Sequence, residues 1–480
     1  MSGADLSSLL PILVLGTAIV VVMLVIAFFR DHRLIAGLTL VSLALAFGAL
    51  FAVAPSAPRQ VTPLLAVDSY SLFFAGLILA ASFAVTLMSY GYLNRMIMQR
   101  EEFYLLLLLA TLGSIVLASA THFASFFLGL EILSVSLYGM IAYPRWRQIS
   151  IEAGLKYLVL AGASSAFLLF GMALVYGELG TMEFGRMASA VSARGGSGSS
   201  AILLTGLAMI LVGFGFKLAV VPFHLWTPDV YEGAPAPATA FVATISKGAT
   251  FALLLRLFTL VDIRHQPTIF LAVAVISVAS MLGGNLLALL QSNVKRILAY
   301  SSISHLGYLL IAFLATGPLG PIAVALYLVA YFVTTLGTFG VVTVLSGPER
   351  DADSLDDYRG LFWRRPWIAG VFTAMLLSLA GIPLTAGFVG KFYLASAGVG
   401  SALWVLVVIL VVGSGIGLYY YLRVASVMFA RQREGEAAPA TYPSAAGGLV
   451  LGVLSVLLLW IGVYPSPLID LIQSAVGRLG

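Results

Sequence analysis

The sequence has no cysteine and very little charge. Of its 480 residues, 9% are charged and 61% are hydrophobic, whereas a soluble domain carries about 25% charged residues. The composition therefore predicts an integral membrane protein. The missing cysteines exclude disulfides, thiolate metal sites and iron–sulfur ligation in this chain.

Histidine is also scarce, and the net charge of +5 comes from basic residues that are spread thinly. This pattern does not predict a metal cluster or a nucleic-acid surface. The start, MSGADLSSLL, lacks the charged region and the cleavage site of a secretory signal. We therefore expect the first apolar run to remain as a membrane span.

Apolar runs of spanning length predict fourteen transmembrane helices. We expect them at 8–29, 34–54, 70–90, 103–120, 122–142, 151–176, 201–221, 237–260, 268–291, 297–316, 319–346, 367–398, 402–430 and 446–464.

Basic residues in the connections predict the orientation, because cytoplasmic loops are enriched in lysine and arginine. One set of loops holds fourteen: Arg30, Arg33, Arg95, Arg100, Arg145, Arg147, Lys295, Arg296, Arg350, Arg359, Arg364, Arg365, Arg431 and Arg433. The opposite set holds only five: Arg59, Arg186, Arg194, Arg264 and Arg478. The first set is expected in the cytoplasm, and both termini on the other, periplasmic side.

Two spans carry helix breakers in their interior. Pro222 interrupts the seventh span, and Gly381, Pro383 and Gly387 interrupt the twelfth. Proline removes a backbone donor and collides with the preceding turn. Broken helices five spans apart indicate an inverted repeat formed by spans 4–8 and 9–13. The expected divisions are 1–100 (three helices), 101–260 (first repeat), 261–430 (second repeat) and 431–480 (last helix and tail).

Six lysines and arginines lie inside predicted spans, and Glu131 is the only acidic residue near the centre of one. The six are Lys156, Lys217, Lys247, Arg256, Lys391 and Arg423. A charge at the bilayer centre costs roughly 3 kcal/mol or more and by default marks function. One carboxylate among several amines makes a poor cage for a hard cation, which needs several oxygens. The same groups suit a proton relay, because a desolvated lysine is driven toward its neutral form.

Each of these residues also has a structural interpretation. Arg256 and Arg423 lie near span ends and are expected to reach the headgroups. Lys156 follows Glu152 by four residues, which suits either a helical ion pair or a pathway. Glu131 and Lys217 could form a static pair.

Two histidines and two polar loops also have structural interpretations. His224 and His305 could be satisfied core histidines rather than relay members. The loop at 347–366 is expected to be solvated, with a docking surface as the alternative. The segment 194–200, RGGSGSS, lacks the features of a phosphate site and is expected to be a connector.

The run PFHLWTPDVYEGAPAPATAFVATISKG, the setting GLEILSVSLYGM and the loop DDYRGLFWRRP closely resemble subunit N of the proton-translocating NADH:quinone oxidoreductase, respiratory complex I. The likeness covers nearly the whole chain. The PFHLW–PD segment is shared with the sister subunits L and M and with cation/proton antiporters, whereas VYEGAP is more particular to N. Lys391 favours N over M, and the length argues against L.

The resemblance implies fourteen helices with two inverted five-helix repeats and a relay of named residues. Glu131 matches the glutamate paired with Lys217, Lys247 matches the central lysine, and Lys391 matches the lysine of the exit half. Secondary relay positions are implied for His224 and His305, and Lys156 is a further secondary candidate from its place inside the sixth span. Protons would pass from the cytoplasmic side through Lys217 and Lys247 and leave at Lys391, with Glu131 setting the charge of Lys217.

The resemblance also implies that this chain is a non-redox subunit of the oxidoreductase, without catalytic activity of its own. It would hold no cofactor, and FMN, iron–sulfur clusters and quinone would belong to partner subunits. The expected partners are the antiporter-like subunits M and L and small subunits including K, in the bacterial inner membrane. The alternatives are a subunit of a multi-subunit cation/proton antiporter and a non-pumping structural subunit of the membrane arm.

Overall fold

The computed structural model describes residues 3–96, 99–193, 200–261, 266–431 and 444–477. Thirteen helices in this part of the chain are long and apolar enough to cross a membrane. Beside them, the described residues form one small antiparallel hairpin of β1 (Arg59–Thr62) and β2 (Leu65–Val67). The predicted class, an all-α integral membrane protein, is confirmed.

The long helices follow the predicted spans closely. The first six spans are α2 (Leu10–Phe28), α3 (His32–Val53), α4 (Ser69–Leu93), α5 (Glu101–Ser119), α6 (Phe123–Ile141) and α7 (Gln148–Leu179). The seventh is divided into α9 (Ala201–Leu218) and α10 (Trp226–Gly233), and the eighth consists of α11 (Ala236–Phe241), a π-helical turn η2 (Val242–Ser246) and α12 (Lys247–Val261). The rest are α13 (Pro267–Leu289), α14 (Val294–Leu314), α15 (Leu319–Leu345), α17 (Pro366–Ala380) with α18 (Ala386–Gly400), α19 (Trp404–Phe429) and α20 (Ala445–Val463).

Several short elements were not predicted. They are α1 (Gly3–Ser8), η1 (Ala54–Ser56), the β-hairpin, α8 (Phe184–Ala193), η4 (Leu355–Tyr358), α16 (Leu361–Arg364) and α21 (Ser466–Val476).

Both predicted breaks are present. In the seventh span, Ala219 adopts a left-handed conformation with φ 61° and Pro222 follows before α10 begins. In the twelfth, Gly381 has φ 91° and Pro383 lies between α17 and α18. Taking α17 and α18 as one interrupted span gives the fourteenth crossing that the sequence predicted.

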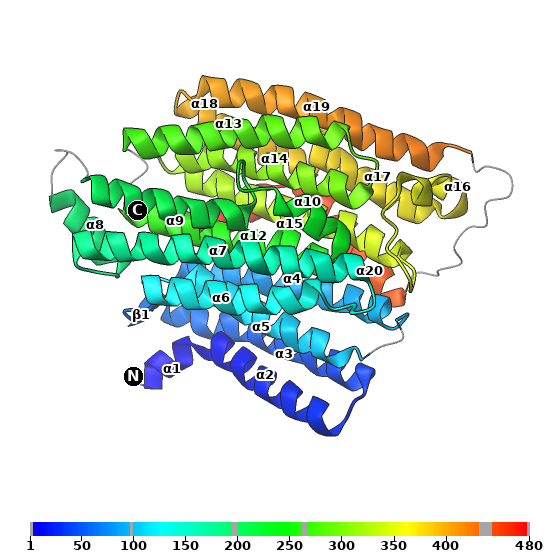
Figure 1. The fold of residues 1–480 in the computed structure, drawn as a ribbon, viewed down its shortest axis with the longest axis horizontal. Coiled ribbons are helices and arrows are strands. Elements are labelled where there is room, and N and C mark those ends of the chain that lie inside the picture. Colours follow the sequence, from blue (N-terminus) through cyan, green and yellow to red (C-terminus); the bar gives the residue numbers. More distant parts are fainter. Residues whose placement is uncertain (1–2, 97–98, 194–199, 262–265, 432–443, 478–480) are drawn as a thin grey trace.

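The helices lie side by side along the long axis of Figure 1, with α2 and α3 at one side and α18 and α19 at the other. The eighth span is wholly buried in its most apolar stretch, and α14 and α15 are nearly so. By contrast, most of α2 faces outward. The interior of the bundle is therefore built around α11–α12, α14 and α15.

Helix α1, near the start of the described residues, lies at the left of Figure 1, and α16 lies at the right. That both termini share one side of the bundle remains a prediction from the sequence. The inverted repeat and the domain boundaries remain predictions from sequence. Four basic residues used for the orientation lie outside the described residues (Arg194, Arg264, Arg433 and Arg478), as does most of the predicted connector at 194–200.

Candidate functional site

Lys217 is buried at the end of the first half of the broken seventh span. Its side chain lies in the last turn of α9 and the residue is 4% exposed. The ammonium donates to Ser134 Oγ of α6 at 2.8 Å and to the Tyr157 hydroxyl of α7 at 2.9 Å. The break that follows leaves this lysine at a helix C-terminus, where positive charge is favoured.

Glu131 lies on α6 one turn before Ser134, and it is half-buried. Its Oε1 accepts a hydrogen bond from Ser165 Oγ of α7 at 2.6 Å. Within the described residues, no nitrogen–oxygen contact of 4.0 Å or less joins Glu131 to Lys217. Glu131 and Lys217 therefore do not form an ion pair in this structure. Each is hydrogen-bonded to hydroxyl groups instead.

Lys247 begins α12, directly after the π-helical turn η2, and is 1% exposed. Its ammonium donates to Ser302 Oγ of α14 at 2.6 Å and lies 5.4 Å from the ring centre of Tyr231. Ser302 Oγ is also 2.6 Å from the Tyr331 hydroxyl of α15. The Lys247 ammonium therefore lies next to a group of hydroxyls that includes Ser302 and Tyr331.

His305 continues this group one turn along α14. It is 3% exposed, with Nδ1 2.6 Å from the Tyr327 hydroxyl and Nε2 3.1 Å from the Tyr421 hydroxyl. Tyr421 also hydrogen-bonds Ser301. A histidine between two hydroxyls can accept a proton on one nitrogen and release one from the other.

Lys391 lies on α18 beyond the second break and is 7% exposed. Its ammonium donates to the carbonyl of Ala380, the last residue of α17, at 3.0 Å and to Ser414 Oγ at 3.1 Å. It lies 5.2 Å from the ring centre of Tyr308. Tyr308 is on α14, three residues beyond His305, so α14 runs past both Lys247 and Lys391.

Two of the predicted secondary relay residues, Lys156 and His224, lie apart from these groups. Lys156 is 42% exposed in its side chain and pairs with Glu152 and Asp229, both at 2.7 Å. The predicted ion pair with Glu152 is present, and Asp229 is a second partner that the sequence did not indicate. His224 is 9% exposed in the first break, and its Nδ1 has no hydrogen-bond partner among the described residues.

The expectation that Arg256 reaches the headgroups is wrong. Arg256 is 2% exposed and donates to both carboxylate oxygens of Asp68 at 2.8 Å, over the ring of Tyr70. Asp68 is the N-cap residue of α4. Because this carboxylate pairs with the Arg256 guanidinium, Arg256 does not have to reach water or the headgroups. Arg423 instead donates to the carbonyls of Leu289 and Gln291 at the end of α13.

The hydroxyl groups were not predicted from sequence. Ser301, Ser302, His305 and Tyr308 recur on α14 at spacings that share a helix face, and this was the available signal. Serine and tyrosine are common in membrane helices, however, so this pattern alone does not indicate a functional site. It does so only once the structure shows that the lysines contact these residues.

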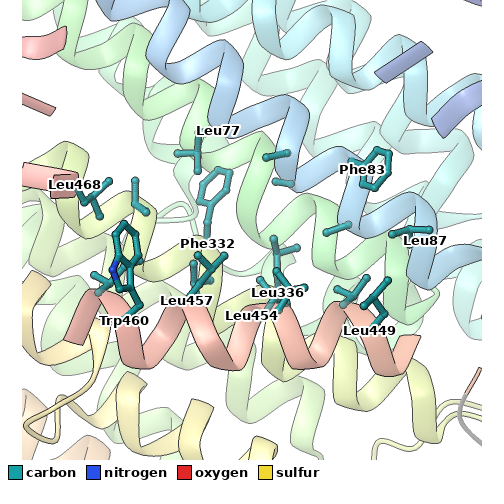
Figure 2. A pocket seen from close by; sticks show the side chains of 18 residues that line it. Leu77, Phe83, Leu87, Phe332, Leu336, Leu449, Leu454, Leu457, Trp460 and Leu468 are labelled. Carbon is teal, nitrogen blue, oxygen red and sulfur yellow. The ribbon is translucent and has the colours of Figure 1, made fainter. Parts of the chain in front are cut away.

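One apolar pocket is separate from these polar groups. It encloses about 410 Å³ between α4, α15, α20 and α21, and aliphatic and aromatic side chains line it. Figure 2 shows Leu77, Phe332 and Trp460 around it, with no ionisable group among the labelled residues. Because a charge is costly in such surroundings, this pocket is not part of the polar site.

Comparison with known proteins gives one family. Residues 120–417 match the family described as NADH:quinone oxidoreductase/Mrp antiporter, TM. A chain of respiratory complex I from Thermus thermophilus, solved with bound aureothin, is 33% identical with a TM-score of 0.82, over 97% of this chain and 99% of that chain.

Two further structures share the fold. A chain of the Mrp complex from Dietzia sp. DQ12-45-1b is 22% identical, and a chain of the membrane-bound sulfane sulfur reductase, an archaeal respiratory membrane complex, is 24% identical. Each has a TM-score of 0.87, with 99% of this chain and 97% of the other covered.

Proposed function

Because the chain belongs to the NADH:quinone oxidoreductase/Mrp antiporter transmembrane family, we propose that it is a membrane-arm subunit that moves protons along its buried lysines. Lys217, Lys247 and Lys391 are the main carriers, and His305 connects the last two. Glu131 adjusts the charge of Lys217. His224 and Lys156 are secondary members, near the first break and at the basic end of the bundle.

The observation that carries this proposal is the set of partners of the three lysines. Each ammonium is buried, and within the described residues it meets hydroxyls and a carbonyl rather than a carboxylate. A buried ion pair would hold a lysine permanently charged, whereas a hydroxyl can accept from an ammonium and donate to a neutral amine. Each lysine can therefore keep a partner in both protonation states.

Among members of the family, subunit N of respiratory complex I is the assignment that we propose for this chain. The VYEGAP segment and Lys391 support it, as does the 33% identity to the Thermus complex I chain. Its partners would then be the antiporter-like subunits M and L and small subunits including K. FMN, iron–sulfur clusters and quinone would belong to other subunits, so the chain takes part in the enzyme without performing redox chemistry.

The distribution of basic residues supports a location in the bacterial inner membrane with the basic loops in the cytoplasm. Protons would be taken up at that end and released on the side of the two termini, the periplasm. At about 150 mV, moving one charge across the membrane costs roughly 3.5 kcal/mol. A charge pair about 4 Å apart at an effective dielectric near 20 is worth about 4 kcal/mol. The free energy of closing and opening the Glu131–Lys217 pair is therefore large enough to drive the movement of one proton.

The test is to purify the complex that contains this chain and to compare wild type with Lys217→Ala and Glu131→Ala. We expect flavin and iron–sulfur subunits to co-purify, and both variants to assemble with coupled quinone reduction lowered about tenfold. A complex without redox subunits would instead establish the multi-subunit antiporter. Variants that change assembly but never proton flux would establish the structural role.

A further inference from the structure

The loop after α15 places the carboxylate of Asp351 inside the bundle. Asp351 is 6% exposed and accepts hydrogen bonds from the Tyr92 hydroxyl at 2.6 Å, Arg147 Nη1 at 3.1 Å and Lys295 Nζ at 2.8 Å. These donors come from α4, from the residue before α7, and from α14. The expectation of a fully solvated loop is therefore wrong at this position.

Asp351 is ionised in this setting. Burial alone would raise the pKa of its carboxyl group, but Lys295 and Arg147 outweigh burial and lower the pKa below its ordinary value. A carboxylate this deeply buried is tolerated only with charged partners and full hydrogen bonding. The cluster of Asp351, Tyr92, Arg147 and Lys295 thus ties three spans and a loop together.

Lys295 extends this cluster to α10, the second half of the broken seventh span. Beside Asp351, its ammonium donates to the carbonyls of Glu232 at 2.8 Å and Ala234 at 2.6 Å. Those carbonyls lie at the C-terminal end of α10, where a cation is favoured. All three ammonium donors are used, so the end of α10 is held at two points by one side chain.

The held end of α10 includes Tyr231, which contacts the surroundings of Lys247. The Tyr231 ring lies 5.4 Å from the Lys247 ammonium, and its hydroxyl lies 3.5 Å from Ser302 Oγ, which accepts from Lys247. Because Tyr231 directly precedes Glu232, a shift at the Lys295 contacts moves the ring relative to Lys247.

We propose that Asp351 is a positioning residue for Lys247, acting through Lys295 and the end of α10 on Tyr231. The inference rests on the proposed proton relay, because it assigns to a loop residue the placement of one relay lysine. Removing the charge of Asp351 leaves Lys295 buried beside Arg147 without its anion. The ammonium then shifts, and α10 loses its fixed position against Lys247.

The test uses the intact complex with Asp351→Asn, and Asp356→Asn as the matched control. Asp356 is in the same loop, is 71% exposed in its side chain and pairs with Arg359 at the surface. We expect Asp351→Asn to lower proton translocation per assembled complex about tenfold and Asp356→Asn to leave it unchanged. Normal translocation per assembled complex in Asp351→Asn would overturn the proposal.

A merely structural role is separated by repeating the substitution in a Tyr231→Leu background, which retains Ser302 as the partner of Lys247 and so retains measurable pumping. If Asp351 acts through Tyr231, adding Asp351→Asn to Tyr231→Leu causes little further loss. Equal fold losses in the two backgrounds would contradict the proposed route.

Should Asp351→Asn fail to assemble, Tyr92→Phe provides the test. It removes the hydrogen bond that Tyr92 donates to Asp351 and the one that it accepts from Arg147 at 3.3 Å, and it leaves both cations paired with Asp351. We expect a loss of about threefold that also disappears in the Tyr231→Leu background, and an unchanged rate would refute the inference. Lys247→Ala separates the two levels. Normal pumping in Lys247→Ala overturns the relay itself. If Lys247→Ala loses pumping while Asp351→Asn and Tyr92→Phe pump at the wild-type rate, only the positioning role is overturned.

Discussion

At the scale of single residues, the burial of three lysines was predictable and their hydrogen-bond partners were not. Lys217, Lys247 and Lys391 stand out in the sequence because a charge inside an apolar span is costly and has few structural explanations. Ser302 and Tyr331 do not stand out, because hydroxyl side chains in a helix can satisfy themselves on the preceding turn. Only folding shows which hydroxyls meet a lysine.

The prediction at this scale concerns Ser302, the hydrogen-bond partner of the Lys247 ammonium. Ser302→Ala removes this partner and the link to Tyr331, and an unpaired buried group costs about 1–3 kcal/mol. We expect proton translocation by the assembled complex to fall about tenfold. Dye-based measurement of pumping in proteoliposomes checks this.

Ser455→Ala is the control for Ser302→Ala. Ser455 lies on α20 and donates only to the carbonyl of Leu451 in its own helix. Pumping should stay at the wild-type rate in this variant. Equal rates in both variants would remove Ser302 from the pathway.

At the scale of helices, the two interruptions followed directly from local chemistry. Pro222 and Pro383 cannot continue a helix, and a left-handed glycine is a common helix end; Gly381 occupies that position after α17. The π-helical turn before Lys247 carried no such mark, because Val242–Ser246 contains neither proline nor glycine. The predicted seventh span ended at residue 221, so it did not include α10, the short second half that follows the break.

The twelfth span offers a matched pair of glycine substitutions. Gly381 has φ 91°, and a Cβ added there would lie 2.9 Å from the Lys391 side chain. Gly370 lies within α17, where an added Cβ meets nothing within 4 Å. We expect Gly381→Ala to cost about 1–2 kcal/mol of stability from backbone strain and to displace Lys391, which reduces pumping.

Thermal unfolding of the purified complex and pumping assays test this pair together. Gly370→Ala should be neutral or slightly stabilising, because alanine favours the helix by about 1 kcal/mol over glycine. Equal thermal midpoints and equal pumping in the two variants would show that the break does not position Lys391.

At the scale of the whole molecule, the sequence predicted the number of crossings and their alternation, because hydropathy and loop charge depend on local composition. It did not predict which distant groups meet. Asp351 was assigned to a solvated loop because its neighbours in sequence are polar, yet it binds Tyr92, Arg147 and Lys295 from three other parts of the chain. Arg256 was assigned to the headgroups, yet it finds Asp68.

The central claim is that protons cross the membrane through this chain's buried lysines, and proton yield per electron in Lys247→Ala tests it most directly. The purified complex is reconstituted in liposomes, subunit content is verified, and protons released are counted against donor oxidised. We expect full assembly with proton yield and coupled turnover both reduced, turnover by about tenfold or more. Wild-type proton yield and turnover in a fully assembled Lys247→Ala complex would contradict it.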